Sequence, residues 1–304
     1  MIRKWLVVLS AALVLGACQS APAPAKVTVP TLNVVAAETF LADIAQNVAG
    51  ERATVKSLMP IGVDPHSFEP TPQDVATIAE SNVLIVNGSG FEGFLDELLK
   101  NAGGERTLIE ASNGLTPRTP GSTENVDEPI DPHFWLDPNH VIKYVENIRD
   151  GLQKIDPLAA VYYGANADKY IQQLQAVDKI ISEQIAAIPE SRRLIVTNHE
   201  SFGYFADRYG FKVIGTIIPS VSTGAAPSAQ QLAKLIDQIK ATGASAIFLE
   251  TGTNPQLAQQ IASETGINVV TDLYSHSISD PRGPAPTYID MIQANVLAIV
   301  KALK

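Results

Sequence analysis

Residues 156–189 read DPLAAVYYGANADKYIQQLQAVDKIISEQIAAIP, and this stretch decides how the rest of the chain is arranged. Its opening Asp-Pro pair is typical of a helix start, because the Asp side chain accepts from free backbone N–H groups and proline is tolerated at the first helical position. Apolar residues then recur at helical spacing, at positions 161, 162, 165, 171, 174, 177, 181, 185 and 188, until Pro189. A helix of about 31 residues is roughly 45 Å long, whereas an ordinary helix has only about 11–12 residues. The stretch therefore predicts one long helix that spans and connects two lobes.

Predicted strands alternate with predicted helices on both sides of this long helix. Before it, the pattern predicts strands at 32–38, 53–59, 82–87 and 107–110, with helices at 39–49, 73–80 and 91–101. After it, the pattern predicts strands at 193–198, 212–217, 244–250 and 268–273, with helices at 229–242, 255–265 and 287–303. Such alternation is typical of parallel βαβ units. The predicted fold class is α/β: two small lobes with mostly parallel sheets flanked by helices, joined by one long connecting helix.

The N-terminus has the features of an export signal. Arg3 and Lys4 precede an apolar run at 5–15 that is too short to span a membrane as a stable helix. The run ends in Leu-Gly-Ala-Cys18, and Cys18 is the only cysteine of the chain. This pattern resembles a lipobox, in which lipid is attached to the cysteine and cleavage makes it the first residue; the alternative is an ordinary signal peptide with an incidental cysteine. We expect an exported protein that is lipid-anchored at the outer face of the cytoplasmic membrane, or periplasmic or outer-membrane-anchored if the envelope has two membranes.

These features divide the chain into five predicted segments. They are a lipoprotein signal peptide at 1–18, a Pro/Ala-rich tether at 19–30, an N-terminal lobe at 31–155, the connecting helix at 156–188 and a C-terminal lobe at 189–304. Hydrophobic residues make up 45% of the chain and charged residues 18%, which is typical of a globular protein. The formal net charge of −10, without a cluster of Lys and Arg, argues against a nucleic-acid partner. We expect the protein to be a monomer.

Four of the five histidines fall where they can converge. His66, His199 and His276 each follow a predicted strand within a few residues, and His133 lies in a short loop ahead of a predicted helix. Ligands of open parallel sheets bind outside the carboxyl ends of the strands, so two histidines from each lobe would meet between facing lobes. Imidazole nitrogen suits Zn, Cu, Ni and Fe, and four protein ligands make a closed tetrahedral site. The pattern predicts a metal site, although any one of these histidines alone could be a hydrogen-bonded loop residue.

The remaining histidine and the aromatic residues near these motifs have simpler interpretations. His140 lies in the first turn of its predicted helix, where a cation is disfavoured, and we expect it to be structural or exposed. We expect the nearby aromatic side chains to pack around the site or in the core: Phe68, Phe134, Trp135 and Phe202.

Four motifs resemble those of the metal-specific solute-binding proteins of ABC importers, the zinc- and manganese-binding lipoproteins with a rigid helix between their lobes. The motifs are DPHSFEP at 64–70, DPHFWLDP at 131–138, NHESFGYF at 198–205 and GPAPTYID at 283–290. The resemblance covers the chain from about residue 32 to the C-terminus. It implies that His66, His133 and His199 are the first three ligands, that Zn²⁺ or Mn²⁺ is the transported ligand, and that an ABC permease in the cytoplasmic membrane is the partner.

The fourth ligand departs from the family pattern. Many members have an aspartate in a Leu-Tyr-x-Asp-Ser context, where this chain has LYSHS at 273–277, so that His276 takes the place of the aspartate. Asp272 is the alternative ligand if the register differs. Four nitrogens favour Zn²⁺ over Mn²⁺, which prefers oxygen. The loop at 116–130 lacks the histidines that zinc-dedicated members often carry there, and Mn²⁺ therefore stays the alternative.

Four neutral imidazoles leave the charge of a divalent cation uncompensated. We expect carboxylates that accept from the imidazole N–H groups to offset this charge, and the candidates are Glu200, Asp137 and Glu250. Because imidazoles bind metal only when neutral, we also expect metal affinity to fall below about pH 6.5.

Two other functions stay open as alternatives. A zinc hydrolase could use Glu200, beside His199, as its general base, but the motif reads HESFG rather than HExxH, and four protein ligands leave no position for a catalytic water. A surface adhesin is a label that relatives have carried, yet the sequence has no feature that indicates an adhesive surface. The sequence therefore predicts a receptor, not an enzyme, that captures a divalent transition metal and delivers it to a permease.

Overall fold

The computed structural model describes residues 32–119 and 130–304. The predicted signal peptide, Cys18 and the tether lie outside the described residues. Within the described part, no helix combines the length and the apolar character needed to cross a membrane.

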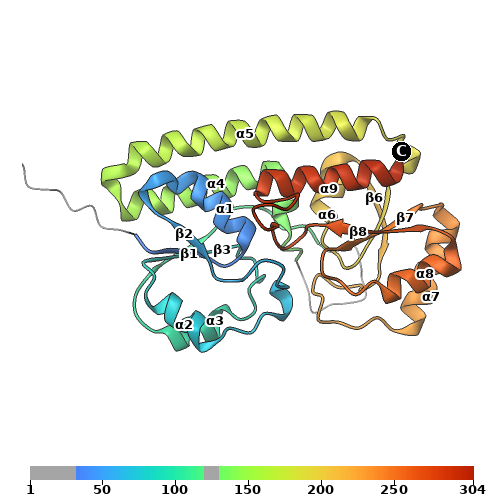
Figure 1. Cartoon of the computed structure of the whole chain (residues 1–304), viewed down its shortest axis with the longest axis horizontal. Coiled ribbons are helices and arrows are strands. Elements are labelled where there is room, and N and C mark those ends of the chain that lie inside the picture. Colours follow the sequence, from blue (N-terminus) through green and yellow to red (C-terminus); the bar gives the residue numbers. More distant parts are fainter. Residues whose placement is uncertain (1–31, 120–129) are drawn as a thin grey trace, which may run out of the picture. The chain divides into compact units, whose positions relative to one another are not determined.

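The first lobe is built on a four-stranded parallel sheet with the strand order β2-β1-β3-β4 (Figure 1). Its strands are β1 Val34–Ala36, β2 Val55–Ser57, β3 Val83–Val86 and β4 Thr107–Glu110. Its helices are α1 Thr39–Ala49, α2 Pro72–Ala79, α3 Leu95–Ala102 and α4 Pro138–Ile155. Every residue of β3 is buried, because Val83 and Ile85 face the core under α1 while Leu84 and Val86 face the core under α2 and α3. A strand covered on both faces explains why its sequence is continuously apolar.

The second lobe repeats this plan with a parallel sheet in the order β6-β5-β7-β8. Its strands are β5 Leu194–Thr197, β6 Lys212–Thr216, β7 Ala246–Glu250 and β8 Asn268–Leu273. Its helices are α6 Gly203–Tyr209, α7 Ala229–Thr242, α8 Gln256–Thr265 and α9 Tyr288–Leu303. Ile247 and Leu249 of β7 pack under α7 and α8, whereas Ala246 and Phe248 face the larger core that the two lobes share.

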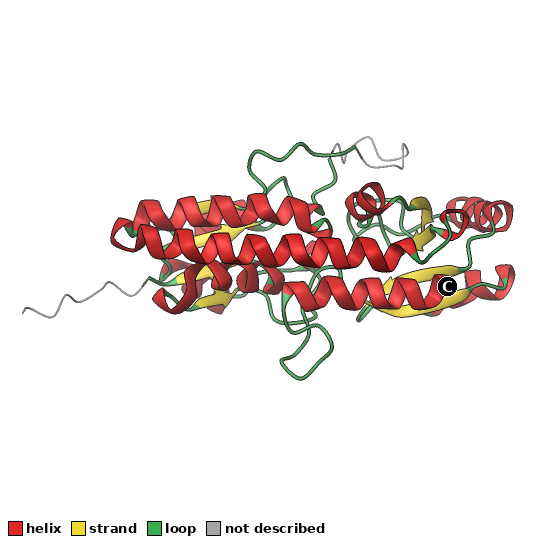
Figure 2. Ribbon diagram, turned by 90° about the horizontal axis from the view of Figure 1, so that it is seen from above, coloured by secondary structure: helices red, strands yellow, loops and turns green. Residues whose placement is uncertain are grey.

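A single long helix, α5 Ala160–Ala186, joins the lobes. It has 27 residues, and the predicted first turn after Asp156 is a separate 3₁₀ turn at Pro157–Ala159. It packs against α1 and α4 of the first lobe and against α9 of the second, and these long helices lie side by side in Figure 2. Its buried stripe belongs to one core that both lobes share: Tyr163, Ala167, Tyr170, Leu174, Val177, Ile181 and Ile185. The predicted α/β fold with two lobes and a long connecting helix is confirmed.

Helix α6 is the element that the sequence did not predict. It is only seven residues long and begins at Gly203, a poor helix former, so that local preference gives no signal for it. Tertiary packing explains its presence, since Tyr204, Phe205 and Tyr209 are buried in the shared core. This helix follows His199 directly and therefore helps to set the position of that residue.

Candidate metal centre

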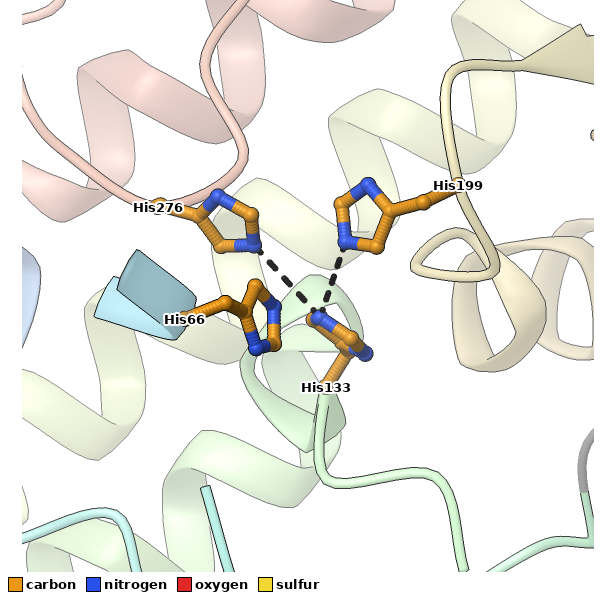
Figure 3. Close-up of side chains that lie close together, drawn as sticks. All are labelled: His66, His133, His199 and His276. Carbon is orange, nitrogen blue, oxygen red and sulfur yellow. Dashed lines mark hydrogen bonds between the residues drawn. The ribbon is translucent and has the colours of Figure 1, made fainter. Parts of the chain in front are cut away.

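The structure brings together the four histidines that follow or precede the predicted strands and helices (Figure 3). His66 lies in a 3₁₀ turn at Pro65–Ser67 after β2, and His133 immediately precedes the 3₁₀ turn Phe134–Leu136 that leads into α4. His199 and His276 follow the ends of β5 and β8. One ring nitrogen from each imidazole lies within 4.8 Å of the other three. The cluster is drawn from both lobes, two histidines from each.

The repeated Asp-Pro-His motif explains how the two histidines of the first lobe are held. Asp64 Oδ1 accepts from the backbone N–H of His66 at 3.0 Å, and Asp131 Oδ1 accepts from that of His133 at 3.0 Å. The intervening proline fixes its own φ, so the carboxylate and the following N–H meet in a tight turn. Asp131 Oδ1 also lies 2.8 Å from Nδ1 of the His133 ring. The motif therefore orients the backbone in both cases and the imidazole itself in the second.

Two buried carboxylates face the Nδ1 side of the imidazoles. Asp131 meets His133, and Glu250 Oε1 lies 2.8 Å from Nδ1 of His199 while its Oε2 lies 3.7 Å from Nδ1 of His276. Carboxylates in these positions favour the tautomer that carries its proton on Nδ1, which leaves the Nε2 lone pair free. The Nε2 atom of His133 lies 3.3 Å from that of His199 and 3.5 Å from that of His276. Nitrogen lone pairs at this separation repel one another unless a proton or a cation lies between them.

Burial and these carboxylates shift the pKa values of the four histidines in different directions. Burial lowers the pKa of His66 to about 4 and the pKa values of His133 and His276 well below the usual range. Burial also opposes a charge on His199, but the Glu250 carboxylate outweighs it and raises the pKa of His199. Burial would raise the pKa of Glu250, but His199 and His276 outweigh it and hold that pKa at about 2. Three imidazoles are therefore neutral over a wide pH range, and His199 is the one that competes for a proton near neutrality.

The other predicted carboxylates occupy different places. Glu200 lines a separate cavity of the second lobe, and its backbone N–H donates to Ser220. Asp137 caps α4 by accepting from the backbone N–H of Asn139 at 2.8 Å. Asp272, the alternative fourth ligand, is exposed near the end of β8, whereas His276 is buried in the cluster.

Asp131 is the carboxylate that sequence reasoning missed. The Asp-Pro-His motif occurs twice with the same spacing, and an aspartate two residues before a histidine is a signal that could have identified it. Burial raises the pKa of Asp131 to about 6, against the backbone N–H of His133 and the guanidinium of Arg118, which both lower it. Asp131 is therefore ionised at neutral pH, although its side chain has no exposed surface.

Aromatic side chains form one wall of the cluster. The ring of Phe91 meets that of His66 edge to face at 5.1 Å, and the ring of Trp135 lies 5.1 Å from that of His133. Trp135 stacks on Phe40, and its Nε1 donates to the carbonyl oxygen of Ser275 at 2.6 Å, beside His276. This wall places apolar rings against His66 and His133, and Trp135 connects the two lobes next to the site.

The remaining aromatic residues and His140 are structural. Phe134 stacks on Tyr204, Phe68 packs on Phe94 and Phe202 packs on Phe205. His140 is half-buried, with its ring edge to face against Phe134 and Tyr204.

Two cavities reach the cluster, one lined by Asp64 and the other by His66. One, of about 450 Å³, is lined by Asp64, Glu250 and His276 and lies between the lobes. The other, of about 610 Å³, is lined by His66 and Phe91. Thr223 of the second lobe donates from Oγ1 to Oδ2 of Asp64 at 2.5 Å, which joins the lobes between these two openings. A small ion can therefore approach a cluster that is otherwise buried.

Comparison with known proteins places the chain in one family. Residues 34–302 match the family model for the zinc-uptake complex component A, periplasmic. The manganese-binding lipoprotein MntA of Halalkalibacterium halodurans is 34% identical over 272 residues, which cover 90% of this chain and 88% of that protein. The iron-binding protein YfeA of Yersinia pestis is 31% identical over 274 residues, which cover 90% of this chain and 87% of that protein.

A solved structure agrees with this assignment. The periplasmic zinc-binding protein TroA of Treponema pallidum is 27% identical and superposes with a TM-score of 0.81, covering 90% of this chain and 99% of that one. The resemblance expected from the four motifs is thereby confirmed. The chain belongs to the zinc-uptake component A family, whose members are solute receptors of ABC importers and not enzymes.

Proposed function

We propose that this protein captures a divalent transition metal between its lobes through His66, His133, His199 and His276, and delivers it to an ABC permease. The observation that carries the proposal is the 3.3 Å separation of the Nε2 atoms of His133 and His199. Both rings have a carboxylate on the Nδ1 side, so both direct a lone pair at the same point. A cation at that point converts this repulsion into coordination.

Zn²⁺ is the metal that the geometry favours. A tetrahedral zinc site with Zn–N bonds of about 2.0–2.1 Å has its nitrogens about 3.3–3.4 Å apart. Two of the Nε2 pairs, at 3.3 and 3.5 Å, are close to this spacing. Four imidazole nitrogens suit Zn²⁺ better than Mn²⁺, which prefers oxygen ligands. Mn²⁺ is the alternative, because a relative that covers most of the chain is a manganese-binding lipoprotein.

Two carboxylates compensate the charge of the bound cation. Asp131 and Glu250 are both buried and face His133, His199 and His276. A carboxylate that accepts from a ligating imidazole raises the basicity of the ring and fixes its orientation. Together the two negative charges offset much of the charge of a divalent ion that neutral imidazoles alone would leave uncompensated, although Arg118 also pairs with Asp131.

The placement of the protein follows from its N-terminus and its family. We propose that residues 1–18 are a lipoprotein signal peptide, that lipid on Cys18 anchors the chain, and that residues 19–30 tether it outside the cytoplasm. Residues 31–155 and 189–304 then form the two metal-binding lobes, with 156–188 as the connection, and the receptor acts as a monomer. Several relatives are lipoproteins, among them MntA, which supports this placement.

Metal content, affinity and coordination test the proposal together. Protein purified without chelator should contain one zinc per chain by elemental analysis, and X-ray absorption should give four nitrogen neighbours. The chain with alanine at His66, His133, His199 and His276 is the matched control and should bind no zinc in calorimetric titrations. Wild-type protein without affinity for Zn²⁺ and Mn²⁺ would refute the proposed function, and a zinc-bound water would favour the hydrolase instead.

A further inference from the structure

Arg118 forms a link between the lobes directly behind the metal cluster. Its Nη1 lies 3.3 Å from Oδ2 of Asp131, and its Nε lies 3.0 Å from Oδ2 of Asp207 on α6. Its backbone N–H donates to the hydroxyl of Tyr204 at 2.9 Å, and that hydroxyl donates to the carbonyl oxygen of Asp131 at 2.7 Å. The guanidinium carbon also lies 5.8 Å from the centre of the Tyr204 ring. Arg118 is therefore held on one side by the loop that carries His133 and on the other by the helix that follows His199.

The two carboxylate oxygens of Asp131 contact different partners, one a histidine and the other this arginine. Oδ1 accepts from the backbone N–H and lies 2.8 Å from Nδ1 of His133, while Oδ2 faces Arg118. The Asp131 side chain has no exposed surface, whereas that of Arg118 is 26% exposed and that of Asp207 is 66% exposed. A buried carboxylate that lacks a cationic partner is strongly destabilising, and without Arg118 the Oδ2 atom of Asp131 would lose its partner. Arg118 supplies that partner, and the orientation that it gives to Asp131 is passed to the His133 ring.

Gly203 offers a second way to displace this guanidinium. A Cβ atom added to Gly203, the first residue of α6, would lie 1.8 Å from Nη1 and 2.4 Å from Cζ of Arg118. The backbone of Gly203 is not in the left-handed region, so a larger residue here would meet the Arg118 guanidinium without backbone strain. A helix start that carries any larger side chain would push the guanidinium away from Asp131.

We propose that Arg118 is a positioning residue that fixes His133 against His199 and thereby sets the affinity and the geometry with which the site holds its metal. Because it joins Asp131 to α6, a shift of one lobe relative to the other at this point changes the orientation of His133. This inference rests on the proposed function, since it concerns the same four imidazoles. Arg118 itself touches no metal and acts through Asp131.

The test compares two variants that remove the link by different means. Arg118→Met deletes the guanidinium and keeps the apolar stem, whereas Gly203→Ala keeps every charge and displaces the guanidinium by steric conflict. Arg208→Met is the matched arginine control, because Arg208 also lies on α6 but pairs with Asp178 of α5. Gly164→Ala is the matched glycine control, because its added Cβ would make only an ordinary contact of 3.6 Å. The readouts are the zinc dissociation rate, measured by trapping released metal with a chelator, and the visible absorption of the Co²⁺-loaded protein.

We expect both test variants to release zinc at least about 10-fold faster than the wild type. Losses of this size are typical when a residue that supports a metal-ligating side chain is removed. Their Co²⁺ bands should shift or weaken as the tetrahedral geometry distorts, and both controls should match the wild type. Arg118→Lys keeps the positive charge but not the fork that reaches two carboxylates, and should fall between the wild type and Arg118→Met.

Three outcomes are decisive. Wild-type dissociation and Co²⁺ bands in Gly203→Ala and Arg118→Met would overturn the inference, even if the melting temperature of the metal-free variants falls, because the link would then be structural only. If Arg118→Met does not fold, Gly203→Ala and Arg118→Lys still decide the question. If the wild type and both controls fail to bind zinc, the proposed function fails, and that result is distinct from the failure of this inference.

Discussion

Oε1 of Glu250 lies 2.8 Å from Nδ1 of His199, and Oε2 of the same carboxylate lies 3.7 Å from Nδ1 of His276. One buried side chain on β7 thus faces two of the four imidazoles, both from the second lobe. In the first lobe, Asp131 faces Nδ1 of His133. Two buried carboxylates therefore lie behind the histidine cluster, and most of the testable properties of the proposed site depend on them.

Replacing Glu250 should weaken metal binding. Glu250→Gln removes the negative charge that offsets the divalent cation and that lies beside Nδ1 of His199, so zinc affinity should fall by about 10- to 100-fold. Calorimetric competition against a chelator of known affinity at pH 7.5 measures the change. Glu200→Gln is the matched control, since Glu200 lies beside His199 in the sequence but lines another cavity. Equal losses in both variants would show that the position of Glu250 is not special.

Replacing His276 by aspartate should change the metal preference. An oxygen ligand in place of the fourth nitrogen suits Mn²⁺ better, so His276→Asp should lower zinc affinity and raise manganese affinity relative to the wild type. The ratio of the two affinities, obtained by competition between the metals, should move towards Mn²⁺ by at least about 10-fold. Asp272→Asn should leave this ratio unchanged, because Asp272 is exposed at the end of β8. A ratio that changes with Asp272→Asn and not with His276→Asp would transfer the fourth ligand to Asp272.

Metal affinity should depend on pH through one imidazole proton, not four, with a further contribution from the Asp131 carboxyl, whose pKa is about 6. His199 has a pKa raised above its ordinary value by Glu250, so it is the first imidazole to take a proton as the pH falls. The pKa of His66 is lowered to about 4, and those of His133 and His276 are also lowered, so these three stay neutral longer. A plot of the logarithm of zinc affinity against pH should have a slope of about one to two between about pH 5 and pH 6.5, because the Asp131 carboxyl also takes up a proton in that range. Chelator competition over that range checks this, and a slope of three or four would contradict it.

The buried pair Glu38 and Glu92 should make the metal-free protein less stable at high pH. Burial, with Glu92 nearby, raises the pKa of Glu38 well above its ordinary value, and burial raises that of Glu92 to about 7. A folded pKa above the unfolded one means that the folded state binds more protons, so this contribution is complete below the unfolded pKa of about 4.3 and is lost as the pH rises through about 7. Glu38→Gln should therefore stabilise the metal-free protein at pH 8, by about 1–3 kcal/mol, and have little effect at pH 4.5.

Thermal or urea unfolding of the metal-free protein at these two pH values measures the effect of Glu38→Gln. Glu38 is the residue to replace because Glu92 accepts from the backbone N–H groups of Asn87 and Gly88. Glu190→Gln, at an exposed position, is the control. A destabilisation by Glu38→Gln at pH 8 would show that the ionised pair is accommodated without cost.

Much of the fold followed from local patterns. The ranges 39–49, 107–110, 229–242 and 268–273 match α1, β4, α7 and β8 to the residue. The two helices combine a helical period with a glycine at the C-terminal end, Gly50 and Gly243, and Ser228 caps the start of α7. The strands predicted at 32–38 and 53–59 are longer than β1 and β2, since only the residues opposite a partner strand enter the ladder. Helix α6 carries no local signal and exists because the shared core buries its aromatic residues.

For the candidate site as well, local sequence predicted some features and tertiary packing decided the others. The residue types and their places after strands indicated His66, His133, His199 and His276, because the ends of parallel strands are fixed by the alternation of elements along the chain. The choice between His276 and Asp272 as the fourth ligand depends on where β8 ends. The choice among Glu200, Asp137 and Glu250 depends on the directions of their side chains. Local sequence alone determines neither. The sequence by itself determined two α/β lobes, a long connecting helix and a set of imidazoles suited to a metal. Only the tertiary structure decided that Asp131 and Glu250 face those imidazoles and that Arg118 links the lobes behind them, because contacts between distant segments arise when the lobes pack together.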